Sequence, residues 1–289
     1  MKSTNFTLRE GRIEDAHDCA SIFYQALKIL NDQHSLPTEL GSVEATIESF
    51  SSMFKRQNVY SVVAELDGHI VGSNFLQCNG AIAGVGPLSV SPMTQGRSIG
   101  KHLMQYVLDY AWEQKFAGVR LVQAAYNSTS LSLYAKLGFH VREPLTVLKG
   151  TTLQLEVEAG YIVRTGTLAD IDICNKLCFQ VHGHVRHVEL LNAIEQQTLT
   201  VVEYNNNITG YTTGLSFDGH AVAYSDRDLK ALLSAATAIS GAGFLLPIRN
   251  TELFRWCLEK GLQVVRPMTL MSMGLYNEPV GAFLPSIFY

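Results

Sequence analysis

Hydrophobic and polar positions alternate with two different periods in the first part of the chain. Apolar side chains in residues 16–30 recur every three or four positions, which predicts one face of an amphipathic helix. Residues 60–66 and 69–76 are rich in β-branched side chains and flank the turn dipeptide Asp67-Gly68. This pattern predicts a β-hairpin that follows a helical region.

The pattern then changes to strands separated by helices. A strand over 82–90 leads through a glycine-containing loop into a helix that ends near Lys115. An apolar strand over 119–125, a short helix over 130–137 that Gly138 terminates, and a strand over 144–148 follow. This order predicts an α/β (α+β) fold with a central, mostly antiparallel mixed sheet flanked by helices.

The second half of the chain repeats the first. Three ordered blocks match, each at its own constant offset: Arg9, Gly11, Asp15 and Cys19 with Arg164, Gly166, Asp170 and Cys174; Val63, Glu65, Ile70 and Gly72 with Val201, Glu203, Ile208 and Gly210; Asn127 and Gly138 with Asn250 and Gly261. We therefore predict two tandem domains, an N-terminal repeat (residues 1–152) and a C-terminal repeat (residues 158–289). The C-terminal repeat is shorter where the N-terminal repeat has its glycine-containing loop, so we expect only the first copy to use that loop.

Composition narrows the class of partner. The chain has 289 residues, 47% of them hydrophobic, and a formal net charge of -4, which suits a folded protein and gives no electrostatic footprint for nucleic acid. No apolar stretch is long enough to span a membrane, and the first residues do not have the pattern of a secretory signal, so we expect a cytoplasmic protein without a membrane partner. The 5 cysteines have neither the spacing nor the density of a disulfide scaffold and are expected to be reduced.

The loop that follows the 82–90 strand has the chemistry of an anion site. It passes into a helix, where successive backbone N–H groups can bind a phosphate, and its small residues allow close approach. Arg97 and Lys101 are positive, and residues 68–108 contain no Asp or Glu. Composition alone also allows an ordinary strand-to-helix turn, because a lone glycine spacing is a weak signal.

Two segments carry a family resemblance. Residues 95–100, Gln-Gly-Arg-Ser-Ile-Gly, resemble the Gln/Arg-x-x-Gly-x-Gly/Ala loop of the GCN5-related N-acetyltransferase (GNAT) superfamily. Residues 127–139 resemble a second segment of that family, Asn-x(6)-Tyr-x-x-x-Gly-Phe. They match it at Asn127, Tyr134 and Gly138-Phe139. The chain departs from the pattern at Ser98, where the family usually has glycine. Together with the repeat, the resemblance is to a tandem-domain GNAT protein of bacterial type.

The resemblance implies a site for acetyl-CoA in the N-terminal repeat. The strand before the loop would pair with the pantetheine arm, and the loop amides would hold the pyrophosphate. The implied cofactor-binding residues are Leu88, Ser89, Val90, Gln95, Gly96, Arg97, Ser98, Ile99, Gly100, Lys101, Asn127 and Tyr134. No metal is implied.

The implied reaction is attack of a neutral amine on the thioester, with expulsion of a thiolate. Tyr134 is the candidate general acid, because the resemblance places its hydroxyl near the sulfur; packing of the ring on the sheet is the alternative reading. The strand position where many relatives have Glu offers only Gly84, Gly86 and Ser89. Glu65, Gln123, a water chain or an amine that arrives deprotonated stay open as the base.

Other segments have weaker signals. Cys257 stands at the position equivalent to Tyr134, so the C-terminal repeat is expected to lack the acid and to complete or shape the acceptor pocket. The histidines of residues 182–187 could be written as a metal site, but imidazoles over the acceptor cleft or in solvent are the preferred reading. The segment 31–41 could border the acceptor, and the apolar C-terminal residues 275–289 are expected to pack on the body or on a partner chain.

These observations predict an acetyl-CoA-dependent N-acetyltransferase, an acyltransferase whose acceptor is a small-molecule or peptide amine. A CoA- or acyl-CoA-binding sensor without catalysis is the alternative, motivated by the missing base and the degenerate second copy. An interaction scaffold without a ligand is a third reading. The acceptor, the acyl chain length and the oligomeric state stay open, and an oligomer is possible.

Overall fold

The computed structural model describes residues 6–37 and 41–288. Its N-terminal half contains β1 Phe6–Glu10, α1 Ala16–Gln33, α2 Val43–Lys55, β2 Val59–Leu66, β3 His69–Gln77, β4 Ile82–Val85, β5 Ser89–Val90, α3 Ile99–Glu113, β6 Gly118–Ala124, α4 Ser128–Lys136 and β7 His140–Lys149. Its C-terminal half contains β8 Tyr161–Thr165, α5 Ile171–His182, α6 His187–Glu195, β9 Thr200–Tyr204, β10 Asn207–Thr212, β11 Ala221–Ala223, α7 Asp226–Ala235, β12 Phe244–Pro247, α8 Thr251–Glu259, β13 Gln263–Gly274 and β14 Ala282–Leu284.

These strands form two sheets. The larger sheet has nine strands in the order β1-β2-β3-β4-β6-β13-β7-β12, with β5 paired to β3 beside this path. The smaller sheet has five strands in the order β14-β11-β10-β9-β8. All the strand pairs of the described residues are antiparallel except β4 with β6, which run parallel on either side of α3. The predicted mixed, mostly antiparallel sheet flanked by helices is therefore confirmed.

Helices cover both faces of the N-terminal part of the large sheet. One face packs against α1 and α2 through a cluster that includes Phe50, Val63 and Phe75. The opposite face packs against α3 and α4 through a cluster that includes Leu103 and Val119. We call these the α1 face and the α3 face, because the candidate site uses both sides of the sheet.

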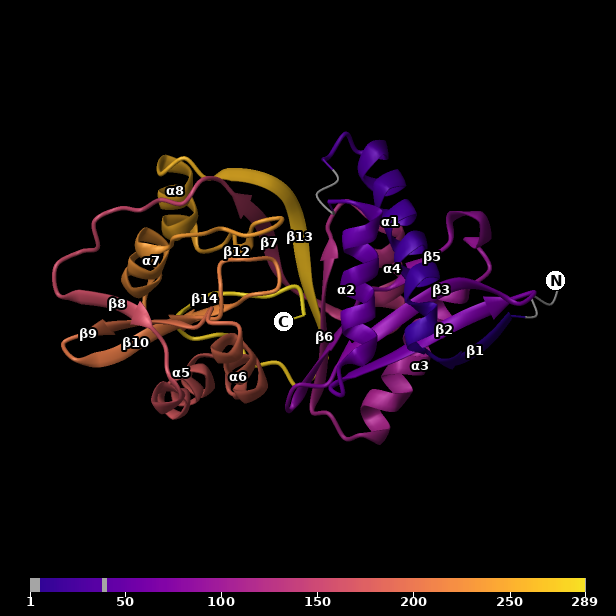
Figure 1. Cartoon of the computed structure of the whole chain (residues 1–289), viewed down its shortest axis with the longest axis horizontal. Helices are drawn as coiled ribbons and strands as arrows, with labels where there is room; N and C mark the ends of the chain where they lie inside the picture. Colours follow the sequence, from indigo (N-terminus) through magenta and orange to yellow (C-terminus); the bar gives the residue numbers. More distant parts are fainter. Residues whose placement is uncertain (1–5, 38–40, 289) are drawn as a thin grey trace.

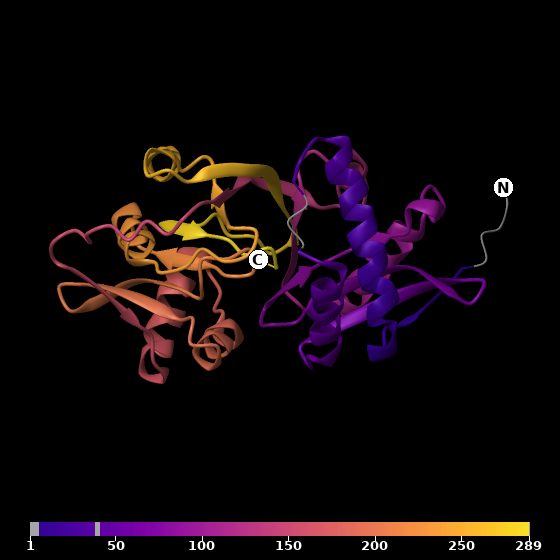
Figure 2. The same cartoon turned by 45° about the horizontal axis from the view of Figure 1, so that its top comes forward.

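The two repeats exchange their last strands. β7 and β13 are equivalent in sequence, and they lie side by side between β6 and β12, so that β13 separates β7 from β6 and β7 separates β13 from β12. In Figure 1 the first repeat, indigo to magenta, and the second, orange to yellow, meet at these strands. Figure 2 shows β13 arching from the second repeat into the junction. The sheet thus runs continuously from one repeat into the other.

The repeat is confirmed in atomic detail by an ion-pair network that occurs twice. Arg9 bonds Asp15 and Glu65, each at 2.7 Å. The equivalent Arg164 bonds Asp170 at 2.8 Å and Glu203 at 2.7 Å. In both copies the aspartate also accepts a hydrogen bond from the backbone that precedes the first helix. The helix order agrees as well, since α1 to α4 match α5 to α8 along the chain.

Some predicted elements differ from the structure. The single strand expected over 82–90 is divided into β4 and β5 by a cis Gly86-Pro87 bond. The strand expected over 144–148 extends over the whole of β7, and α2 was not predicted. The hairpin is correct: Asp67 and Gly68 both have positive φ, as a type I′ turn needs. Within the described residues, no helix has the length and apolar character to cross a membrane.

Candidate functional site

Two neighbouring strand segments separate near the centre of the N-terminal repeat: β4 pairs with β6, but β5, which follows β4, does not. We call this separation of β5 from β6 the splay. β4 pairs with β6 only as far as Gly84 opposite Arg120. Beyond that rung β5 pairs with β3, and none of the described strands pairs with the β6-facing edge of β5. Ser91 donates its N–H to the carbonyl of Val71, so the N–H and C=O of Val90 point the other way, toward β6. The edge of β5 at Val90 is therefore open to pairing with an extended ligand.

The predicted loop lies next to this splay. Gly100, in the first turn of α3, stands close to strand and helix alike: an added Cβ would be 3.6 Å from Val90, 3.6 Å from Leu133 of α4 and 4.0 Å from Leu88. Gln95, Gly96, Arg97, Ser98 and Lys101 are exposed around it, whereas Ile99 is buried and anchors the helix in the core. The structure thus brings the predicted loop residues, the strand and α4 together.

The start of α3 has the features of an anion site. Among the described residues, no side chain caps this helix, so the N–H groups of its first turn point outward without an intrahelical partner. Gly96 has a φ of 83°, a backbone conformation that favours glycine. Ser98, the residue that departs from the family pattern, has a φ of 61° and holds the left-handed conformation that glycine usually provides. The backbone at Ser98 therefore has the conformation that a glycine would adopt, and this conformation is strained for a serine.

Asn127 immediately precedes α4, and Tyr134 projects from this helix. The Oδ1 of Asn127 accepts the N–H of Ser130 at 3.1 Å and caps the helix. Tyr134 is 8% exposed and packs in the same cluster as Leu88, Val90 and Leu121, which flank the splay. Burial raises the pKa of Tyr134 to about 12, and no described residue hydrogen-bonds its hydroxyl. This hydroxyl therefore stays protonated at neutral pH and is available as a donor.

The open candidates for the base have other contacts. Glu65 is paired with Arg9 in the repeated ion-pair network. Gln123 lies on the α3 face, and its Oε1 accepts a hydrogen bond from Ser130 at 2.9 Å. Gly84, on the strand where relatives have Glu, faces the opposite, α1 side of the sheet. The geometry therefore gives no base among these residues.

In the C-terminal repeat the equivalent splay is filled from within the chain. β14 pairs with β11 on the edge that faces β12, and it contacts β12 as well. Leu284 and Ala282 are buried there in the core of α7 and α8. Sequence reasoning predicted a missing loop in this copy, and here β11 ends at Ala223 and α7 begins at Asp226. It missed β14, because strand pairing between distant segments leaves no periodic signal.

The start of α7 also differs from that of α3. Ser225 caps α7, and Asp226 and Asp228 lie in its first turn. Asn250, the equivalent of Asn127, donates its Nδ2 to Oδ1 of Asp226 at 2.6 Å. A carboxylate of the chain thus lies where the first copy has an open helix end. Cys257, at the Tyr134 position, is fully buried.

The predicted histidine segment is not solvated as a whole. His182 and His184 are buried, and His187 alone of the three is exposed. Burial and nearby arginines lower the pKa of His184 to about 3, so it is neutral. Its Nε2 lies 3.4 Å from Arg120 of β6, which ties the segment to the N-terminal repeat. Among the described residues, no group of three or more His, Cys, Asp or Glu side chains could hold a metal ion.

The segment 31–41 lies beside the junction, although residues 38–40 are outside the described part. Tyr126, just before Asn127, donates its hydroxyl to the buried Asn31 at 2.8 Å. Arg266 of β13 donates to the carbonyl of Pro37 at 3.4 Å. The C-terminal residues pack on the body, as predicted, through β14 and the residues that follow it.

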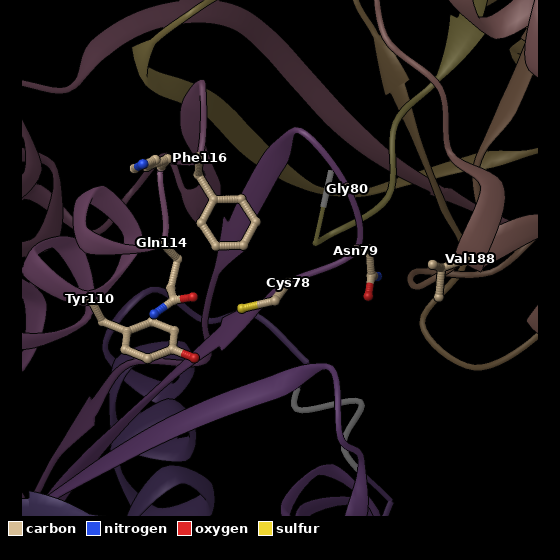
Figure 3. A pocket seen from close by; sticks show the side chains of 8 residues that line it. Cys78, Asn79, Gly80, Tyr110, Gln114, Phe116 and Val188 are labelled. Carbon is tan, nitrogen blue, oxygen red and sulfur yellow. The ribbon is translucent and has the colours of Figure 1, made fainter.

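A cavity of about 430 Å³ lies away from the predicted site. Cys78, Tyr110, Gln114 and Phe116 line it together with Val188 of α6 (Figure 3). It adjoins the C-terminal end of α3, about 20 Å along the helix from the loop. It is therefore no part of the splay or the loop.

Comparison with known proteins agrees with this geometry. Residues 23–139 match the model of the Acetyltransferase (GNAT) family. These residues, in the N-terminal half of the chain, are similar to that family. The match contains the splay, the loop and α4, and the similarity supports acyl transfer as the class of reaction for this half. No curated protein matches the sequence.

Solved structures resemble the whole chain. A Pyrococcus horikoshii protein classed as an acetyltransferase has a TM-score of 0.76 at 17% identity, over 100% of this chain and 96% of its own. A GCN5-related N-acetyltransferase from Sphaerobacter thermophilus has a TM-score of 0.66 at 13% identity, over 94% and 96%. A tandem GNAT protein from the clavulanic acid biosynthesis pathway has a TM-score of 0.54 at 13% identity, over 93% and 98%. These likenesses show a tandem GNAT fold.

Proposed function

We propose that this chain is an acetyl-CoA-dependent N-acetyltransferase with one working site, in residues 1–152, and that residues 158–289 form a domain without a pyrophosphate loop. The observation that carries the proposal is the convergence of three features: an unpaired strand edge at β5, the uncapped start of α3, and the buried hydroxyl of Tyr134. An unpaired edge suits the amides of pantetheine, and an uncapped helix start suits a pyrophosphate.

The two repeats together support the binding of a ligand in the first. In the C-terminal repeat, β14 fills the splay and Asp226 engages the amide of Asn250. In the N-terminal repeat the corresponding places are a strand edge and the amide of Asn127. A ligand with amides and an anionic end would supply there what the chain itself supplies in the second copy.

The roles of the residues follow from these contacts. The edge of β5 would pair with the amides of the pantetheine arm that ends in the thioester. The first turn of α3, with Arg97 and Lys101 beside it, would bind the phosphates. The bound thioester supplies an acyl group that an amine can take. Tyr134 would donate a proton to the sulfur as the bond from carbon to sulfur breaks and the bond from nitrogen to carbon forms. The proton of the amine would leave to solvent or to a base that is not assigned.

Calorimetric titration of acetyl-CoA tests the site. We expect binding at about one molecule per chain, and an Arg97→Glu, Lys101→Glu double variant should bind at least tenfold more weakly, because it puts negative charge beside the phosphates. Both side chains are exposed, so folding should be unaffected. A Lys55→Glu, Lys176→Glu variant, with the same change in charge on exposed helix positions elsewhere, is the matched control. Equal affinity in all three would contradict the assignment.

Turnover separates an enzyme from a sensor. Wild type is incubated with acetyl-CoA and a panel of primary amines, and release of free CoA thiol that depends on the amine is measured. Transfer to any amine supports the enzyme. Tight binding of acetyl-CoA with no transfer to any amine would instead favour an acyl-CoA-binding regulatory protein.

A further inference from the structure

One part of the C-terminal repeat lies against the splay of the N-terminal repeat. A Cβ atom at Gly84 would collide with the carbonyl oxygen of Phe288, and it would stand 3.0 Å from the carbonyl carbon and 3.4 Å from the Cα of that residue. Gly84 forms the last rung that β4 shares with β6, at the closed end of the splay. The backbone at Phe288 thus occupies the space that a side chain at position 84 would need.

This contact is on the α1 face of the sheet. Ala83 and Val85 pack with α3, so Gly84 between them faces the other way. Gln77 and Arg120 are the partners of Gly84 on the two neighbouring strands, and both are buried on the same face. Gly84 therefore forms a notch between two long polar side chains, and the chain near Phe288 lies in it.

Three ties fix this segment to the C-terminal repeat. β14 pairs with β11 immediately before it. Arg186 donates to the hydroxyl of Ser286 at 3.2 Å, and Ile287 donates its N–H to the carbonyl of Phe217 at 2.9 Å. The segment is therefore held in place by one repeat while it covers the other.

The surface that the segment forms beside the splay is apolar. The side chain of Ile287 packs against the same buried cluster as Val122 and Ala124, the α1-face residues of β6 along the splay. All three are partly exposed, so they offer an apolar surface rather than a closed core. Tyr134 approaches the splay from the α3 face. The side that is left for an acceptor is the one that the segment borders.

We propose that residues 285–288 form the wall of the acceptor side and select an amine with an apolar carbon skeleton, an alkyl or arylalkyl amine, over polyamines and amino sugars. The proposal rests on the proposed function. Because its own splay is filled by β14, the C-terminal repeat has no assigned role. Under this proposal, the C-terminal repeat determines which amines the site of the N-terminal repeat accepts. The proposal also accounts for glycine at position 84, because any side chain there would displace the wall.

Kinetics with an amine panel test the wall. Hexylamine and 2-phenylethylamine are compared with spermidine and glucosamine, and we expect the first two to have the higher kcat/KM. Ile287→Ala should raise KM for the apolar amines about tenfold with little change in kcat, because apolar contact area is lost. Its affinity for acetyl-CoA should not change. Val280→Ala, at a 74% exposed position shortly before the segment, is the matched control.

Amide hydrogen exchange tests the position of the segment independently of turnover. Acetyl-CoA should slow amide exchange in peptides that cover residues 282–288 of the full chain, because it closes the splay beside them. Gly84→Ala should speed that exchange and raise KM for the amine. Gly80→Ala should do neither, since a Cβ there meets its first neighbour, the carbonyl of Val185, at 3.7 Å. Ile287→Ala keeps the test open if Gly84→Ala fails to fold.

The outcomes separate this inference from the proposed function. If acetyl-CoA binds and is used but the exchange of residues 282–288 and the amine KM of Ile287→Ala are unchanged, the wall is wrong and the function stands. Preference for spermidine or glucosamine over the apolar amines also overturns the inference alone. If acetyl-CoA does not bind, or no amine is acetylated, the proposed function is wrong and the inference falls with it.

Discussion

Asn250 donates a hydrogen bond to Asp226, whereas Asn127, which stands at the same place in the other repeat, caps its helix with Oδ1. The difference predicts what Asn127→Asp should do. A carboxylate keeps an oxygen for the cap but loses the amide donor. We expect acetyl-CoA to bind about tenfold more weakly, the cost of one lost hydrogen bond, with little change in the urea midpoint.

Asn127→Ala is the comparison for that prediction. It removes both the donor and the cap, so it should also lower the free energy of unfolding by about 1 kcal/mol. If Asn127→Asp binds acetyl-CoA as wild type does, the amide makes no contact with the ligand.

Tyr134→Phe removes the candidate proton donor and little else, because no described residue hydrogen-bonds its hydroxyl. We expect kcat to fall about a hundredfold while the affinity for acetyl-CoA stays the same. Tyr110→Phe is the control and should keep its turnover. Tyr110 lies on α3, and the centroid of its ring is 3.6 Å from that of Tyr60, on which it stacks. Retained kcat in Tyr134→Phe would assign the ring to packing alone.

The pH profile gives a second test of Tyr134. A general acid must be protonated to act, and burial raises the pKa of Tyr134 to about 12. The protonated form therefore persists well above the pKa of an ordinary tyrosine, which is about 10. We expect kcat to show no alkaline decline from this group between about pH 9 and pH 11. A decline near pH 10 that is absent from Tyr134→Phe would contradict the burial of the hydroxyl.

Ser98→Gly should stabilise the protein. The left-handed backbone costs a serine about 1 to 2 kcal/mol, and glycine gives back part of this through its freer unfolded state. The net gain expected in urea unfolding is about 0.5 to 1 kcal/mol, with acetyl-CoA affinity kept. Ser91→Gly, where φ is -51°, has no such strain to relieve and should destabilise. A loss of stability in both variants would mean that Ser98 makes a compensating contact.

Much of the site could be predicted because its signals are local. The loop, the cap at Asn127 and Tyr134 lie in two short segments, and the structure brings them together around β5. The paired Arg9 and Arg164 networks were visible as conserved offsets within one sequence. The exchange of β7 and β13, the filling of the second splay by β14 and the contact of Phe288 with Gly84 were not. They depend on pairing between segments far apart in the chain, which the hydrophobic period of each segment does not encode.

At the junction of the repeats, the buried carboxylate of Glu143 pairs with the half-exposed guanidinium of Arg249. Glu143 of β7 is 1% exposed and accepts a hydrogen bond from Arg249 at 2.5 Å. Burial raises the pKa of Glu143, and Arg249 lowers it again in part. A carboxyl whose pKa is raised by folding stabilises the fold fully below its unfolded pKa, and that contribution is lost as the pH rises through the folded value.

Arg249→Ala should therefore raise the pKa of Glu143 further. At a pH above that pKa, the buried carboxylate of Glu143 is charged and lacks its partner. We expect a loss of about 1 to 3 kcal/mol in urea unfolding at pH 8 and a clearly smaller loss at pH 5. Adding Glu143→Gln should restore most of the stability at pH 8, because the amide carries no charge. If Arg249→Ala costs the same at both pH values, the guanidinium stabilises the junction by packing and not by compensating the charge of Glu143.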